Sequence, residues 1–129
     1  MKTRTFKLNK LVRDEIVQST EVQDGVVNYK KLSGTELTAA LIQKLAEEIE
    51  ELKGANFSAS ELADLKEIIE QLAKNLKITD EQLKAVQTKK RQDNGAFEKG
   101  HFIKTLTLPA DNKWAKYYAA DPKRFPEVK

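Results

Sequence analysis

The chain has 129 residues and a mass of 14.7 kDa, which is about the size of one domain. Its composition, with 40% hydrophobic and 33% charged residues, is typical of a folded, soluble protein. Its short apolar stretches argue against a membrane span, and no apolar run follows the basic start, so we expect no secretory signal. The lack of cysteine excludes disulfide scaffolds, thiolate zinc sites and cysteine nucleophiles, and we expect a cytoplasmic protein.

The net charge of +3 arises from 23 basic and 20 acidic residues that are unevenly distributed. Residues 1–13 contain five basic side chains and no acid, residues 45–70 contain eight acids and two lysines, and residues 84–104 contain six basic side chains and two acids. Nucleic-acid binding needs one continuous basic face, so this pattern makes a nucleic-acid partner unfavourable. It favours a site where carboxylates hold metal ions and the basic flanks hold phosphates.

Helical spacing dominates the first part of the chain. A short helix is expected over about residues 11–19, and residues 21–31 are expected to form a loop or a weak hairpin. Two long helices follow, introduced by capping-box sequences that start at Ser33 and at Ser58. Leucines at helical spacing give each of these two helices an apolar stripe.

A third capping-box sequence starts at Thr79, before a helix that contains Leu83 and Val86. Residues 101–108 have β character but no evident partner strand, and the chain from Pro109 onwards is expected to be irregular. We therefore predict an all-α fold, a four- to five-helix bundle with a central antiparallel helix pair that carries the acidic motifs.

One domain is expected over residues 1–108, with a C-terminal tail over residues 109–129 that packs on the domain or on a partner subunit. Four apolar residues fall outside the main leucine seams: Ile42, Ile49, Ile68 and Leu76. Apolar faces that a small bundle cannot cover are commonly buried between subunits. We therefore expect a homo-oligomer, a dimer or a tetramer.

Residues 47–51 read Glu-Glu-Ile-Glu-Glu and place four carboxylates on one helix. Like charges at this spacing are mildly destabilising, and such a run is usually a solvated helix face. Glu48 does not fit this interpretation, because it lies between Leu45 and Leu52 at a position that the leucine stripe assigns to the core. An unpaired buried carboxylate is costly and calls for a counter-charge.

A second acidic pair, Glu61 and Asp64, follows on the next helix. Each residue has an ordinary alternative: Glu61 could close the capping box of Ser58, and Asp64 could be a surface acid near a helix N-terminus. In a tight antiparallel hairpin, however, Glu51 would face Glu61 and Glu48 would face Asp64. Four converging carboxylates predict a divalent cation, with Mg²⁺ favoured and Mn²⁺ possible. Without the cation, at least one acid is expected to have a raised pKa.

The acidic pattern Glu47-Glu48-x-x-Glu51 followed by Glu61-x-x-Asp64 resembles the EExxE…ExxD signature of the MazG-like all-α nucleoside triphosphate pyrophosphohydrolases. That superfamily also contains the dimeric dUTPases and phosphoribosyl-ATP pyrophosphohydrolase. Two further stretches, KLVRDEI at residues 10–16 and NGAFEKG at residues 94–100, resemble its phosphoribosyl-ATP-pyrophosphohydrolase-like branch. The resemblance covers about residues 8–103, with three motifs in the expected order.

This resemblance implies Mg²⁺-dependent hydrolysis of a nucleoside triphosphate between the α and β phosphates, giving a nucleoside monophosphate and pyrophosphate, as in nucleotide-pool house-cleaning. The implied metal ligands are Glu48, Glu51, Glu61 and Asp64, and Glu47 would support these ligands or help to orient the attacking water. A free carboxylate nearby, Glu47 or Glu50, could accept the proton of that water. Phosphoryl transfer also needs cations that hold the leaving group. The candidates are Lys10, Arg13, Arg91 and Lys99.

Other functions stay open on the sequence alone. The substrate could be phosphoribosyl-ATP, since neither the base nor the sugar follows from the residues. A non-catalytic helical module whose acidic stripe binds a basic partner is a second class, and a basic nucleic-acid binder is a third and weaker one. Release of pyrophosphate that depends on Mg²⁺ would separate the enzyme from both.

Overall fold

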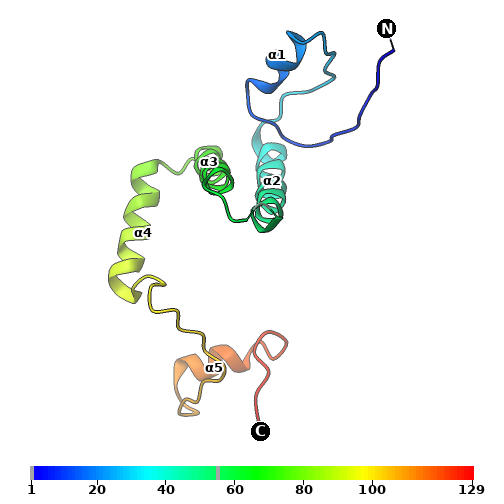
Figure 1. Ribbon diagram of the computed structural model, residues 1–129. Coiled ribbons are helices and arrows are strands. Elements are labelled where there is room, and N and C mark those ends of the chain that lie inside the picture. The colour runs from blue at the N-terminus through cyan, green and yellow to red at the C-terminus, as the bar shows by residue number, and fades with distance from the viewer. Residues whose placement is uncertain (1, 55) are drawn as a thin grey trace. The chain divides into compact units, whose positions relative to one another are not determined.

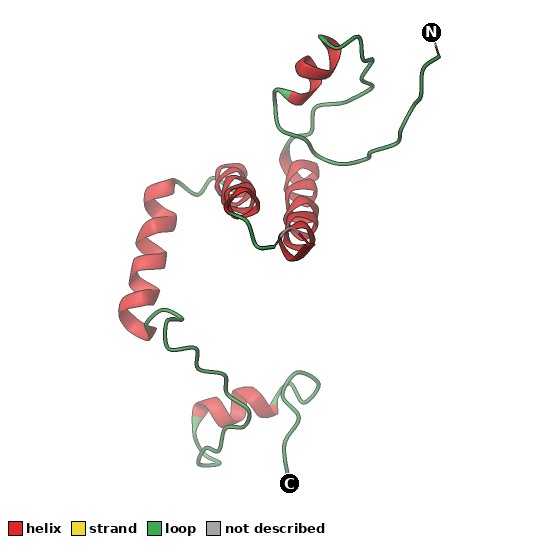
Figure 2. Cartoon of the chain, in the orientation of Figure 1, coloured by secondary structure: helices red, strands yellow, loops and turns green. Residues whose placement is uncertain are grey.

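The structure is a computed structural model that describes residues 2–54 and 56–129. Within these residues the protein is all-α, with five helices and no strand, which confirms the predicted fold class (Figure 2). The helices are α1 (Ile16–Glu21), α2 (Gly34–Gly54), α3 (Ala59–Asn75), α4 (Asp80–Asn94) and α5 (Lys113–Ala119) (Figure 1). None of them is both long and apolar enough to cross a membrane.

Helices α2 and α3 pack against each other (Figure 1). At one end of the pair, the Asn75 side-chain amide of α3 donates hydrogen bonds to the Gly34 carbonyl, at 3.0 Å, and to the Thr38 hydroxyl of α2. Near the other end, Glu48 of α2 lies close to Asp64 of α3. The end of one helix therefore meets the start of the other, and the predicted antiparallel pair is confirmed.

The interior of this pair is small. Leu41, Ile68 and Ala73 are its buried apolar residues, and no large side chain in the described parts of the chain is completely shielded from solvent. Ile68 was predicted to lie outside the seam, and this is wrong: it is one of the two buried residues of α3, with 9% of the residue exposed. Five other apolar residues of the pair stay exposed: Ile42, Ile49, Leu62, Ile69 and Leu76.

The predicted capping boxes differ in outcome. At the start of α4, the Thr79 hydroxyl accepts a hydrogen bond from the Gln82 backbone N–H, and the Gln82 side chain accepts one from the Thr79 N–H, so this box is formed. Ser58 is the N-cap of α3, but its side chain makes no capping hydrogen bond. The alternative role of Glu61 as the partner of Ser58 in a reciprocal capping box is therefore not realised.

Two further predictions need correction. The first helix is α1, six residues long and shifted toward the C-terminus relative to the expected residues 11–19. Residues 101–108, for which no partner strand was expected, contain neither helix nor strand. The tail is not wholly irregular, because Asn112 caps α5 by accepting a hydrogen bond from the Trp114 N–H at 2.8 Å.

The chain divides into two compact units, Met1–Asp93 and Asn94–Lys129. In the second unit, Tyr117 and Tyr118 of α5 each pack against Phe125, with ring centroids 6.0 and 4.9 Å apart. These aromatic contacts fold the end of the chain back onto α5.

Candidate metal centre

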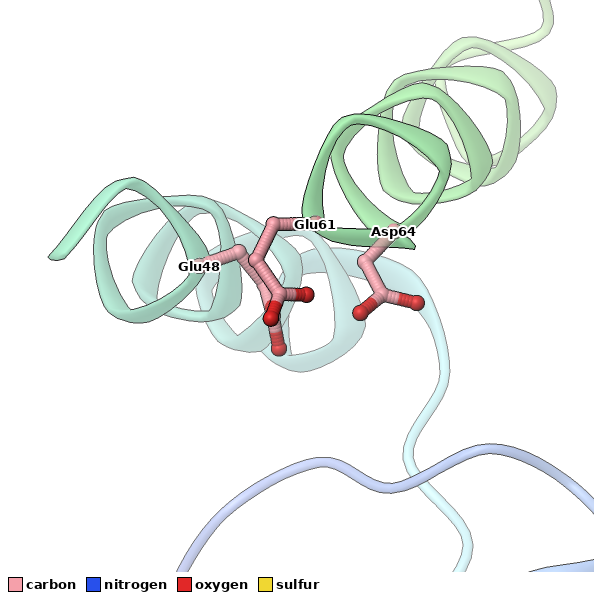
Figure 3. Close-up of side chains that lie close together, drawn as sticks. All are labelled: Glu48, Glu61 and Asp64. Atoms are coloured by element: carbon pink, nitrogen blue, oxygen red, sulfur yellow. The ribbon is translucent and has the colours of Figure 1, made fainter. Parts of the chain in front are cut away.

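Three carboxylates converge where α2 and α3 approach each other. Glu48 of α2 and Glu61 and Asp64 of α3 each place an oxygen within 4.8 Å of the others, and Figure 3 shows the three groups turned toward the same side of the helix pair. We call these three residues the acidic cluster. Hard carboxylate oxygens at this spacing are the ligands of a divalent cation, and the cluster could hold one.

Glu48 is the most informative member of the cluster because it is buried, with only 5% of the residue exposed. Its Oε1 lies 3.4 Å from the Lys44 ammonium group, but its Oε2 is buried without a hydrogen-bond partner among the described residues. A buried carboxylate oxygen without a partner lowers the stability of the folded state, so another interaction must offset the cost of an acid at this position. A cation bound by Glu48, Glu61 and Asp64 would supply the missing partner.

Burial and the neighbouring negative charges of the cluster change the pKa of Glu48. Burial is the main cause that raises the pKa of the Glu48 carboxyl above its ordinary value, and the charges of Glu51 and Asp64 raise it further. The nearby Lys44 acts in the opposite direction without cancelling these effects. The expectation that at least one acid has a raised pKa is confirmed.

The cluster also has a cationic contact from a distant part of the chain. The Arg13 Nη2 atom donates a hydrogen bond to Asp64 Oδ1 at 2.6 Å and forms an ion pair with it, although the two residues are 51 positions apart. This hydrogen bond is the main cause that raises the pKa of the Arg13 guanidinium, which stays charged. Arg13 lies just before α1, so the N-terminal segment contacts the helix pair at this point.

The other predicted acidic residues lie around the cluster. Glu51 is exposed and is not one of the three residues whose oxygens converge, although its charge acts on Glu48. Glu47 is half-buried and lies 3.6 Å from the Lys44 ammonium group. The structure thus brings together three of the four predicted metal ligands and places Glu47 beside them on α2.

Of the four predicted phosphate-binding residues, Arg13 contacts the cluster directly. Lys10 is exposed in the N-terminal segment, and Arg91 is exposed on α4. Lys99 is exposed in the second unit. Arg13 is therefore the residue of this set that the structure ties to the acidic cluster.

From the sequence, Lys44 was given no part in the site. Lys44 lies within 3.6 Å of both Glu47 and Glu48, and its side chain is only 17% exposed. The signal was present: a lysine three and four residues before two glutamates on one helix places all three on the same face. One turn of α2 therefore carries its own counter-charge for the buried Glu48.

We predict that Glu48→Gln stabilises the metal-free protein at neutral pH, because the amide keeps the shape of the side chain and removes a buried charge. The raised pKa means that protonated Glu48 favours the folded state. Its contribution to stability is full below the ordinary pKa and is lost as the pH rises through the raised value. The charges that set this behaviour are Lys44 and Glu51 on α2, Asp64 on α3 and Arg13.

Thermal melts of wild type and E48Q in EDTA, at several pH values across that window, check this prediction. The difference in melting temperature should favour E48Q and should grow as the pH rises toward neutral. A wild-type protein that is the more stable of the two at neutral pH would contradict it.

Comparisons of the chain with known protein families, with curated proteins and with solved structures found no match.

Proposed function

We propose that this protein is a magnesium-dependent nucleoside triphosphate pyrophosphohydrolase of the MazG-like type that acts in the cytoplasm on the nucleotide pool. The observation that carries the proposal is the acidic cluster, in which the buried Glu48 carboxylate converges with two carboxylates of the next helix and has no hydrogen-bond partner for its Oε2 among the described residues. The order of acidic residues along α2 and α3 gives independent support, because it resembles the signature of that family.

Glu48, Glu61 and Asp64 would hold Mg²⁺, or Mn²⁺, with Glu51 as a fourth ligand if its exposed side chain turns inward. The bound cation supplies charge neutralisation at the phosphate oxygens and lowers the pKa of a coordinated water. The protein's own side chains position the water and accept its proton. Glu47 accepts the proton of the attacking water, and its contact with Lys44 holds it on the correct face of α2.

Basic side chains hold the pyrophosphate leaving group, for which a guanidinium is the most suitable donor because it binds two oxygens at once. Arg13 is the first candidate because it already lies at the cluster. Lys10, Arg91 and Lys99 are the further candidates. The released products are a nucleoside monophosphate and pyrophosphate.

A panel of canonical and modified nucleoside triphosphates, with phosphoribosyl-ATP included, tests the proposal. Pyrophosphate release should require Mg²⁺ or Mn²⁺ and should stop in EDTA. The nucleotide that is hydrolysed fastest would identify the preferred base and sugar. Release of phosphate without pyrophosphate, or no turnover of any member, would contradict it. In that case, a non-catalytic helical module would be the better interpretation, supported by the exposed apolar faces of α2 and α3.

A homo-oligomer, formed through the α2–α3 pair, is part of the proposal. Ile42 and Ile49 on α2 are seven positions apart, as are Leu62 and Ile69 on α3 and then Leu76, the C-cap residue of α3, and all five are exposed. A seven-residue spacing places each set along one line of its helix, which is the pattern of a helix seam. Two copies that pack these faces together would form a four-helix arrangement and cover the apolar stripes.

We predict that the protein sediments as a dimer or a tetramer at micromolar concentration and that Ile49→Glu with Ile69→Glu converts it to a monomer, because both charges would enter the seam. Val26→Glu is the matched control, since Val26 is an apolar loop residue that is 99% exposed. A monomeric wild-type protein in analytical ultracentrifugation would refute the oligomer.

A further inference from the structure

Two cationic side chains contact the acidic cluster, and they are held in different ways. Lys44 lies one turn before Glu48 on the same helix, so α2 keeps it in place. Arg13 belongs to a segment without helix or strand, and its contact with Asp64 joins two parts of the chain that are 51 residues apart. Arg13 can therefore leave the cluster without any change in the helix pair.

The backbone of Arg13 is held in place, whereas its side chain is held only by the contact with Asp64. Its backbone carbonyl accepts a hydrogen bond from the Ile16 N–H at 3.1 Å, so the main chain is fixed at the start of α1. Its side chain is 59% exposed, and among the described residues Asp64 is its hydrogen-bond partner. A long arginine side chain fixed at its base and held by one exposed contact can reorient while its backbone stays in place.

The Asp64 carboxylate that accepts the Arg13 hydrogen bond is also one of the three groups that could hold the cation. A divalent cation bound to Asp64 would place two positive charges beside the Arg13 guanidinium and would weaken the ion pair through repulsion and competition for the carboxylate. A guanidinium binds phosphate with the same paired geometry that it uses for a carboxylate. Once released from Asp64, Arg13 is thus a phosphate-binding group already located at the metal centre.

We propose that Arg13 occupies the metal-free cluster as a substitute cation and transfers its guanidinium from Asp64 to a phosphate group when the divalent ion binds. This inference rests on the proposed metal centre. Cation binding frees the guanidinium, and phosphate binding removes the competitor of the cation, so each ligand increases the affinity for the other. The ion pair between Arg13 and Asp64 thereby weakens binding of the cation alone and favours binding of the cation together with the phosphate.

Calorimetric titrations with Mn²⁺ alone and with the manganese–pyrophosphate complex test this exchange in the full chain, without any measurement of turnover. Three variants are compared with wild type: Arg13→Gln, Arg13→Lys and the matched control Arg124→Gln. Arg124 is a suitable control because it forms an exposed ion pair with Asp121 in the second unit, with its side chain 67% exposed.

R13Q should bind Mn²⁺ alone about two- to fivefold more tightly than wild type, which is the range of one exposed ion pair. It should bind the manganese–pyrophosphate complex more weakly than wild type does. R13K should fall between R13Q and wild type in both titrations, since it keeps the charge and loses the paired geometry. R124Q should behave like wild type.

Equal or weaker Mn²⁺ binding by R13Q would overturn the exchange and leave the metal centre intact, since a residue that merely orients Asp64 would lower the affinity when removed. Failure of both wild type and R13Q to bind Mn²⁺ at millimolar concentration would overturn the metal centre and the exchange together. The two failures are therefore distinguishable.

Discussion

Glu48→Gln and Asp64→Asn should each abolish pyrophosphate release while the α2–α3 pair stays folded. Each amide keeps the size of the side chain but loses the charge and the strong ligand oxygen that a divalent cation needs. Mutation of a group that only supports a metal ligand already costs about 10- to 100-fold in affinity or activity. Loss of a ligand itself should exceed that range.

Circular dichroism and steady-state assays at saturating Mg²⁺ measure the two effects separately. Glu36→Gln is the control on the same helix, because Glu36 lies in the first turn of α2 with its side chain 70% exposed and pairs with Lys30 at the surface. Its activity should match that of wild type. Turnover that persists in both cluster variants would remove the acidic cluster from the mechanism.

The burial of Glu48 could be predicted from the spacing of apolar residues along the helix. The leucine stripe of the second helix assigned this acid to the interior, and the structure buries it at 5% exposure. The same spacing predicted the antiparallel pair, because two apolar stripes joined by a short turn have one simple way to cover each other. Periodicity was sufficient here because the signal spans several helical turns.

The ligand set was harder to predict than the helix pair. Glu51 follows Glu48 by three residues, and spacing alone suggested that both point at α3, yet Glu51 is exposed. A shift in helix rotation of a few tens of degrees decides which of two such acids enters the interface, and sequence spacing does not define that rotation. The buried Glu48 instead takes part of its charge compensation from Lys44.

Contacts between distant segments could not be predicted from local pattern at all. The ion pair between Arg13 and Asp64 depends on where the N-terminal segment crosses the helix pair. The short helix α5 was missed for another reason. Short helices are marginal on their own, and α5 has only the Asn112 cap and the packing of Phe125 against its tyrosines to stabilise it.

Divalent cations should stabilise the folded protein strongly, and this is the second large effect that we expect. The acidic cluster exists only in the folded helix pair, so a cation that binds it shifts the folding equilibrium by mass action, by about 2.7 kcal/mol at one hundred times its dissociation constant. For a domain of this size, that corresponds to an increase on the order of 10 °C in melting temperature. In E48Q and D64N the increase should largely disappear.

Thermal melts in EDTA, in Mg²⁺, in Mn²⁺ and in Mg²⁺ with a non-hydrolysable nucleotide analogue resolve the contributions. Mg²⁺ alone should give a smaller increase than Mg²⁺ with the analogue, because Mg²⁺ keeps part of its water shell until phosphate oxygens replace it. Sodium at matched ionic strength should have much less effect, since it only screens the repulsion among the acids. Identical melts in all four conditions would mean that the buried Glu48 carboxylate binds no ion, and the acidic cluster would then be better explained as a structural site whose counter-charges are Lys44 and Arg13.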